Sequence, residues 1–176
     1  MSQPAASIDA LIAALAEIER YVTAEGWDQP VRLFALVSTA RLIEAEPSLA
    51  GQLSGGMPDA LSAIEQDDFH DGEDLVVALE RISWPDEVAG CAVAMERSFL
   101  PLECEHEIPD DPVAAADFVS RHPRRQDVRV VVGALRGGLT HGLARLVTQP
   151  DDLLGADDLV PGLSAALLGT LGEGMD

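Results

Sequence analysis

The sequence predicts an α+β fold: a single domain over residues 1–176 with a mostly antiparallel sheet of about five strands and helices packed on it. Three observations support this fold class. An amphipathic helical stripe opens the chain, short apolar runs alternate with helical segments through its middle, and the last two apolar runs meet at Gly137-Gly138, as in a hairpin. Alternating helices and strands also occur in parallel sheets. However, the Gly-rich phosphate turn typical of nucleotide-binding parallel sheets is absent.

The first half of the chain predicts two helices and two strands. Apolar residues three and four positions apart predict an N-terminal helix, with Ser7 as its N-cap and Gly26 as its stop; they are Ile8, Leu11, Ile12, Leu15, Ile18 and Val22. The run VRLFALV, residues 31–37, predicts a buried strand, and Ser38 or Thr39 then caps a helix that ends near Pro47. A Gly/Ser-rich loop separates this helix from a short strand over residues 61–64.

The second half predicts three helices and three strands. Asp71 caps a helix whose apolar side holds Leu75, Val76, Leu79 and Ile82. The run VAGCAVAM, residues 88–95, is apolar at both alternating positions, which predicts a central strand covered on both faces or a barrel-like bend. Asp111-Pro112 begins a short helix. DVRVVVGAL (127–135) forms the clearest strand, and LTHGLARLV (139–147) forms its hairpin partner. The last helix begins near Pro161.

Charge is the strongest bulk signal. The chain has 31 acidic and 11 basic residues, its net charge is −20, and every basic residue is Arg. Such a field repels nucleic-acid phosphates and anionic lipid headgroups, so we expect no nucleic-acid and no membrane partner. Solubility in a GC-rich organism, salt adaptation and nucleic-acid mimicry all fit this composition. Two cysteines and an N-terminus without a positively charged region predict a cytoplasmic protein.

The catalytic motifs searched for are absent. Without Lys the chain has no phosphate-binding loop of the type GxxxxGK[ST] and no Schiff-base chemistry. The patterns GxGxxG, HExxH, CxxC and GxSxG do not occur either. The sequence therefore predicts no catalytic residues and no cofactor.

Two acidic segments resemble metal sites in part. The segment Glu65 to Leu75, which includes His70, fails the calcium-loop template because Phe69 takes a ligand position and Ala78 replaces the closing Glu. Cys104 and His106, if extended, point the same way and offer two zinc ligands, but no second pair closes the site. The alternative in both cases is a solvated acidic run, and we predict no metal.

The remaining polar candidates favour protein partners. Arg121-His122-Pro123-Arg124-Arg125 is the one basic cluster, suited either to an acidic partner or to the chain's own carboxylates. Both tryptophans precede predicted strands, where they either plug the sheet end or anchor a partner. The predicted partner-binding candidates are Trp27, Asp28, Arg32, Trp84, Glu96 and Arg97. Glu96-Arg97 also fits an internal ion pair.

Four motifs carry a family resemblance over residues 8–171: WDQPxRLFALV, EQ (Glu65-Gln66), WPDEVxGxAxxxER and LVPGL. In these motifs the chain resembles a family of small acidic actinobacterial proteins of unknown function. The resemblance implies an actinobacterial origin, which suits the Arg-only, Ala-rich composition. It implies no activity, cofactor or catalytic residue.

These observations favour a non-enzymatic module that binds a protein or peptide with a basic or apolar segment, or that forms a homodimer. At fold level the pattern resembles small secretion-chaperone-like proteins. The alternative is a hydrolase or isomerase that uses carboxylates and an imidazole, for which Glu65, Glu96 and His141 are the residues to test. A third possibility is a salt-adapted protein or a purely structural component of a larger assembly.

Overall fold

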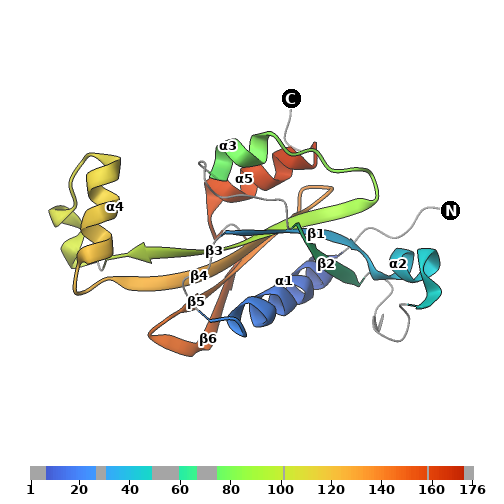
Figure 1. The fold of residues 1–176 in the computed structure, drawn as a ribbon, viewed down its shortest axis with the longest axis horizontal. Coiled ribbons are helices and arrows are strands. Elements are labelled where there is room, and N and C mark those ends of the chain that lie inside the picture. Colours follow the sequence, from blue (N-terminus) through green and yellow to red (C-terminus); the bar gives the residue numbers. More distant parts are fainter. Residues whose placement is uncertain are drawn as a thin grey trace.

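The computed structural model describes residues 7–26, 31–48, 60–66, 75–100, 102–157 and 159–172 (Figure 1). The elements run α1 (Ile8–Thr23), β1 (Arg32–Ser38), α2 (Thr39–Ala45), β2 (Leu61–Glu65), α3 (Leu75–Glu80), β3 (Val88–Phe99), η2 (Leu102–Glu107), α4 (Pro112–Arg121), β4 (Gln126–Leu135), β5 (Thr140–Leu146), β6 (Gln149–Ala156) and α5 (Pro161–Thr170). Within these ranges no helix is long and apolar enough to cross a membrane.

The strands form one six-stranded sheet in the order β2-β1-β3-β4-β5-β6, and every neighbouring pair is antiparallel. The α+β fold class is therefore confirmed. The Gly137-Gly138 hairpin is also present: both residues have φ near +100° (102° and 101°), a backbone region that favours glycine, and they join β4 to β5.

The sixth strand, β6, was not predicted from the sequence. Its segment QPDDLLGA contains a proline and two aspartates and shows no regular apolar alternation. As an edge strand it needs to bury little, and Leu153 and Leu154 are 39% and 53% exposed. Proline and acidic residues are tolerated at a sheet edge because one side of the strand donates to no neighbour.

Helix α1 covers one face of the sheet (Figure 1). The Ser7 side chain caps it by accepting from the N–H of Ala10 at 3.1 Å. The predicted stripe faces the sheet, and its best buried members are Leu11, Leu15, Ile18 and Val22. Gly133 of β4 lets the helix approach closely, because a Cβ there would lie 2.7 Å from Cδ2 of Leu15.

Helices α3 and α5 cover the opposite face (Figure 1). Leucines of these helices, and one that directly follows α5, pack on Cys91, Val93 and Val132 of the central strands; they are Leu79, Leu163, Leu167 and Leu171. The predicted central strand over residues 88–95 is thus covered on both faces, as its unbroken apolar run required. Burial raises the pKa of the Cys91 thiol to about 11, which keeps it protonated and inert at neutral pH.

A buried polar cluster lies beneath the last turns of α1. Arg145 donates two hydrogen bonds to the carboxylate of Glu19, at 2.7 and 2.9 Å. Thr23 donates to Glu19 at 2.6 Å and accepts from Arg129 at 3.0 Å. Arg129 also bonds the backbone O of Gly26 and the carboxylate of Glu96. Each of the two arginines therefore pairs with a carboxylate, Arg145 with Glu19 and Arg129 with Glu96. Arg129 also lies at the C-terminal end of α1, which is the negative end of the helix dipole.

Candidate functional site

A groove runs between α1 and the edge strand β2. Its larger part is a cavity of about 330 Å³. The residues that line it come from the second half of α1 and from β1 and β2: Glu17, Ile18, Tyr21, Phe34, Ser62, Ala63 and Glu65. The floor is apolar, the rim carries two carboxylates, and Tyr21 is 52% exposed. Exposed aromatic surface beside an apolar floor is typical of a binding site.

A second cavity of about 120 Å³ continues the groove along the first half of α1. It shares Glu17 with the larger one and is otherwise lined by Asp9, Ala10, Ala13, Ala14, Ala60 and Leu61. Together the cavities follow the helix from Asp9 to Tyr21, about 18 Å at 1.5 Å per residue. The strand side, from Ala60 to Glu65, spans about 17 Å at 3.4 Å per residue. The two walls match in length, so the groove accommodates about five or six residues of extended chain.

The backbone of β2 points half of its polar groups away from the sheet. Thr39 N–H donates to the O of Ala60 at 2.9 Å, and Gln66 N–H donates to the O of Leu33 at 2.8 Å. The backbone N–H and C=O groups of the even-numbered residues of this strand therefore point toward β1. Because the direction of hydrogen bonding alternates along an antiparallel strand, the N–H and C=O groups of Leu61, Ala63 and Glu65 point outward. Among the described strands, β2 has β1 as its one neighbour.

A charged cluster closes the groove near the C-terminal end of α1. Arg32 donates to both carboxylate oxygens of Glu65, at 2.7 and 2.6 Å, and also pairs with Glu25. Its guanidinium lies 4.9 Å from the centre of the Tyr21 ring, a cation–π distance. Hydrogen bonds from Arg32 lower the pKa of Glu65 against the opposing effect of burial, so Glu65 is ionised at neutral pH.

The predicted partner-binding residues separate in the structure. Arg32 lies at the end of the groove, whereas Trp27 and Asp28 lie outside the described residues. Trp84 packs against the α3/α5 core, and its indole N–H donates to Thr170 Oγ1 at 3.0 Å.

Of the predicted Glu96-Arg97 pair, the structure describes one side chain. Glu96 forms an ion pair with Arg129 at 3.2 Å, within the cluster under α1. The side chain of Arg97 lies outside what the structure describes.

The residues chosen for an acid–base site do not converge. Glu65 and His141 lie at the same level of the sheet, through Phe34, Ala92 and Gly133, but on β2 and β5. Four strand spacings separate their backbones by roughly 19 Å. General acid–base catalysis needs two groups within hydrogen-bond reach of one substrate atom. The structure therefore gives Glu65 and His141 no shared site.

The basic cluster serves the chain's own carboxylates. Arg121 pairs with Asp117, Arg124 with Glu103 and Arg125 with Asp127, at 3.0 to 3.3 Å. The intramolecular alternative is thus observed for all three arginines. Of the acidic segment Glu65 to Leu75, the structure describes Glu65 and Gln66 and the backbone of Leu75, and the rest lies outside the described residues.

The Cys104–His106 pair, which was considered on one condition and was not the favoured interpretation, does not form. It required an extended segment, but residues 102–107 form the 3₁₀ helix η2. Residues three apart share a face in such a helix. Cys104 therefore lies with Glu107, while His106 is exposed.

Sequence reasoning missed the groove itself. Its walls come from segments more than 35 positions apart, and Glu17 carries no local signal that distinguishes it from any exposed helical glutamate. Only the sheet order, with β2 at the edge beside α1, brings these residues together. The alanines at positions 10, 13 and 14 were the one available hint, because small residues on a helix allow a second chain to approach.

Comparison with known proteins identifies a family but no better-understood relative. No curated protein and no solved structure matches the chain. A family model described as PPA1309-like protein matches residues 11–172. This match includes all but the first three residues of α1, the whole sheet and all of α5. The chain therefore belongs to the family of PPA1309-like proteins.

Proposed function

We propose that this protein is a peptide-binding module that takes an extended segment of a partner protein along β2, in the groove beside α1. The observation that carries the proposal is the outward direction of the N–H and C=O groups of Leu61, Ala63 and Glu65 next to a groove of matching length. An added strand would satisfy these groups, as in other cases of strand addition to a sheet edge.

Charge and shape specify the segment. Asp9 and Glu17 border the groove, whereas the charge of Glu65 is met by Arg32. Together with the net charge of −20, the two carboxylates favour a basic partner. The floor offers Ile18 and Phe34 to apolar side chains. Because side chains alternate along a strand, every second residue of the bound segment faces α1. The preferred segment therefore alternates apolar residues, which enter the groove, with residues that face away from α1, and carries Lys or Arg near the acidic rim.

Selection from a random peptide library, followed by affinity measurements on the selected sequences, tests this function. We expect enriched peptides to be basic and to show apolar residues at alternate positions. The substitution Ala63→Pro removes an outward N–H that an added strand needs, at a position where an edge strand tolerates proline. It should raise the peptide's Kd by about tenfold or more, because the complex loses one backbone hydrogen bond and the proline ring strains the pairing beside it.

A charge-matched pair of variants separates the groove from the general acidic field. Glu17→Lys and Glu80→Lys change the net charge equally, but Glu80 lies on α3, which covers the opposite face. Glu17→Lys should weaken the peptide at least about tenfold more than Glu80→Lys does, because field effects fall off with screening. Equal weakening by both, or no enriched peptide at all, would contradict the groove. A chain that dimerises and becomes monomeric in Ala63→Pro would show that a second copy occupies β2 instead.

A further inference from the structure

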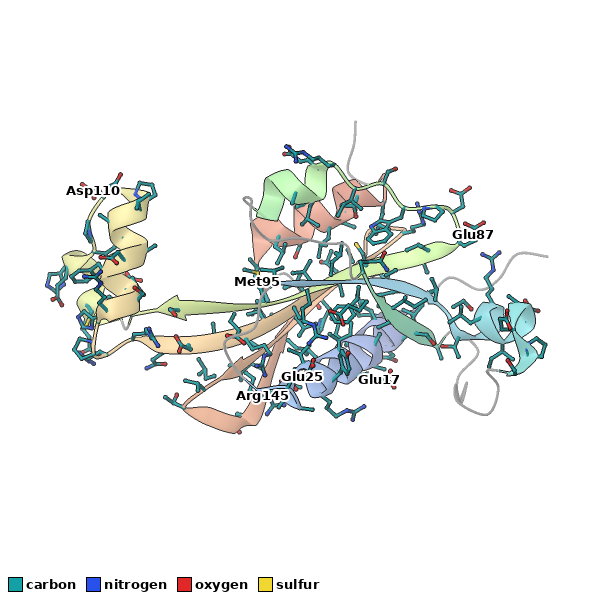
Figure 2. The ribbon with its side chains drawn as sticks, in the orientation of Figure 1. Glu17, Glu25, Glu87, Met95, Asp110 and Arg145 are labelled. Atoms are coloured by element: carbon teal, nitrogen blue, oxygen red, sulfur yellow. The ribbon has the colours of Figure 1, made fainter. Side chains whose placement is uncertain are left out.

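Strands β3 and β4 carry a small module far from the rest of the fold. Helix η2 and helix α4 lie at their distal end, where Asp110 is labelled, away from α1, α3 and α5 (Figures 1 and 2). None of the residues of α4 is buried. Among the described side chains of residues 103–125, Cys104 is the buried one, at 3% exposure. The described side chains of this module therefore provide almost no apolar core to hold it together.

Three metal-ligand side chains meet at its centre. Cys104 and Glu107 project from the same face of η2, and His122 follows the end of α4. One ligand atom of each, the thiol sulfur, a carboxylate oxygen and a ring nitrogen, lies within 4.8 Å of the others. A tetrahedral zinc ion with bonds of about 2.0–2.3 Å places its ligand atoms roughly 3.3–3.8 Å apart, so small side-chain rotations close the site.

A hydrogen-bond donor from outside the ligand set lies beside the sulfur. Arg124 Nη1 donates to the sulfur of Cys104 at 3.5 Å. Arg124 is itself neutralised by Glu103 at 3.0 Å. Hydrogen bonds from outside the ligand set to a bound thiolate are a regular feature of protein zinc sites.

The imidazole has a partner that a metal would replace. Nδ1 of His122 accepts a hydrogen bond from the backbone N–H of Arg124 at 3.1 Å. A neutral ring in this state carries its proton on Nε2. Metal binding therefore exchanges either that hydrogen bond or that proton for the metal bond, as zinc binding ordinarily releases protons. Arg124 is exposed, so water can replace the lost partner of its N–H.

We propose that Cys104, Glu107 and His122 bind a divalent transition-metal ion of the zinc type, which holds η2 against the end of α4. Thiolate, imidazole and carboxylate are the three ligand types that zinc takes in proteins. Three protein ligands leave a fourth position for water or for a side chain of a partner. The ion supplies to this module the folding free energy that an apolar core supplies elsewhere.

Cobalt(II) is the probe for this site, because a thiolate ligand gives it a charge-transfer band and tetrahedral geometry gives it intense d–d bands. We expect the full-length protein to develop both with one Co²⁺ per chain, and Zn²⁺ to displace it. Cys104→Ser should abolish the charge-transfer band, and His122→Ala should weaken Co²⁺ binding at least about tenfold.

His106→Ala and Cys91→Ser are the matched controls, one on the exposed side of η2 and one in the α5 core. Both should retain the spectrum of the unmodified protein, and circular dichroism should show all variants folded. Absence of a charge-transfer band at stoichiometric Co²⁺ would overturn the proposal. Loss of binding in His106→Ala to the same degree as in His122→Ala would also overturn it, because the ligand set would then differ.

Discussion

Replacing Glu19 with Ala is expected to lower the free energy of unfolding by about 3 kcal/mol. The change removes a carboxylate that is 1% exposed and with it the acceptor of two hydrogen bonds from the Arg145 guanidinium. Breaking a buried pair typically costs about 3–5 kcal/mol, because one charge stays desolvated. The lower end applies here because Arg145 is 18% exposed and reaches water. Chemical denaturation followed by circular dichroism measures the difference.

The control for this substitution is Glu17→Ala, two residues earlier on the same helix. Glu17 is exposed, so its removal should change stability by less than about 0.5 kcal/mol. Equal losses in the two variants would contradict the buried network as a source of stability.

The same carboxylate makes stability depend on pH. Burial on its own would raise the pKa of Glu19, but hydrogen bonds from Arg145 and Thr23 and the charges of Arg145 and Arg129 outweigh it and lower the pKa below the ordinary 4.5. A lowered native pKa means that the unfolded chain binds the proton first. The stabilisation is therefore complete above pH 4.5 and is lost as the pH falls below it. In Glu19→Gln the free energy of unfolding should fall less steeply over that acid range.

Leu15→Ala is expected to cost about 2–5 kcal/mol, the usual range for a fully buried leucine. Leu15 is 0% exposed and packs over Gly133 of the central strand β4. Gly133→Ala alone should cost about 1–3 kcal/mol, because its Cβ would lie 2.7 Å from Leu15 Cδ2 and 3.0 Å from Leu11 Cδ1. Thermal and denaturant unfolding measure both losses.

Combining the two substitutions tests the contact directly. In Leu15→Ala/Gly133→Ala the new methyl group occupies space that the leucine vacated. The loss in the double variant should therefore be smaller than the sum of the single losses by about 1 kcal/mol. Strict additivity would show that α1 does not pack over Gly133. Leu154→Ala on β6, where the side chain is 53% exposed, should be close to neutral and serves as the control for leucine truncation.

Much of the fold could be predicted because its local signals agree with its packing. The stripe from Ile8 to Val22 has one apolar side, and that side meets the sheet. The unbroken apolar run at 88–95 lies in a strand covered on both faces. The segment 127–135 was harder to interpret in detail. Its Arg129 interrupts an apolar run and would ordinarily face solvent, but it is 1% exposed because Thr23, Gly26 and Glu96 offer it acceptors.

The candidate sites could not be predicted, because both depend on long-range arrangement. The groove exists because β2 lies at the sheet edge beside α1, and nothing local to the sequence places a short strand at an edge. The Cys104–Glu107–His122 cluster depends on the 3₁₀ helix η2 and on the length of β3 and β4, which carry η2 and α4 at their distal end. Both elements of the groove were predicted but their arrangement was not, whereas of the two helices in the cluster α4 was predicted and η2 was not. Among the predicted partner-binding residues whose side chains the structure describes, Arg32 lies at the groove, whereas Trp84 and Glu96 lie elsewhere.

Nuclear magnetic resonance of the protein bound to a selected peptide tests the strand-addition account most directly. The measurement is amide hydrogen exchange at Leu61, Ala63 and Glu65, together with cross-strand contacts between the peptide and β2. The account predicts that these three amides exchange at least about tenfold more slowly in the complex, while resonances of Glu17, Ile18 and Tyr21 shift. Unchanged exchange at the three amides, with peptide contacts on another face, would contradict it.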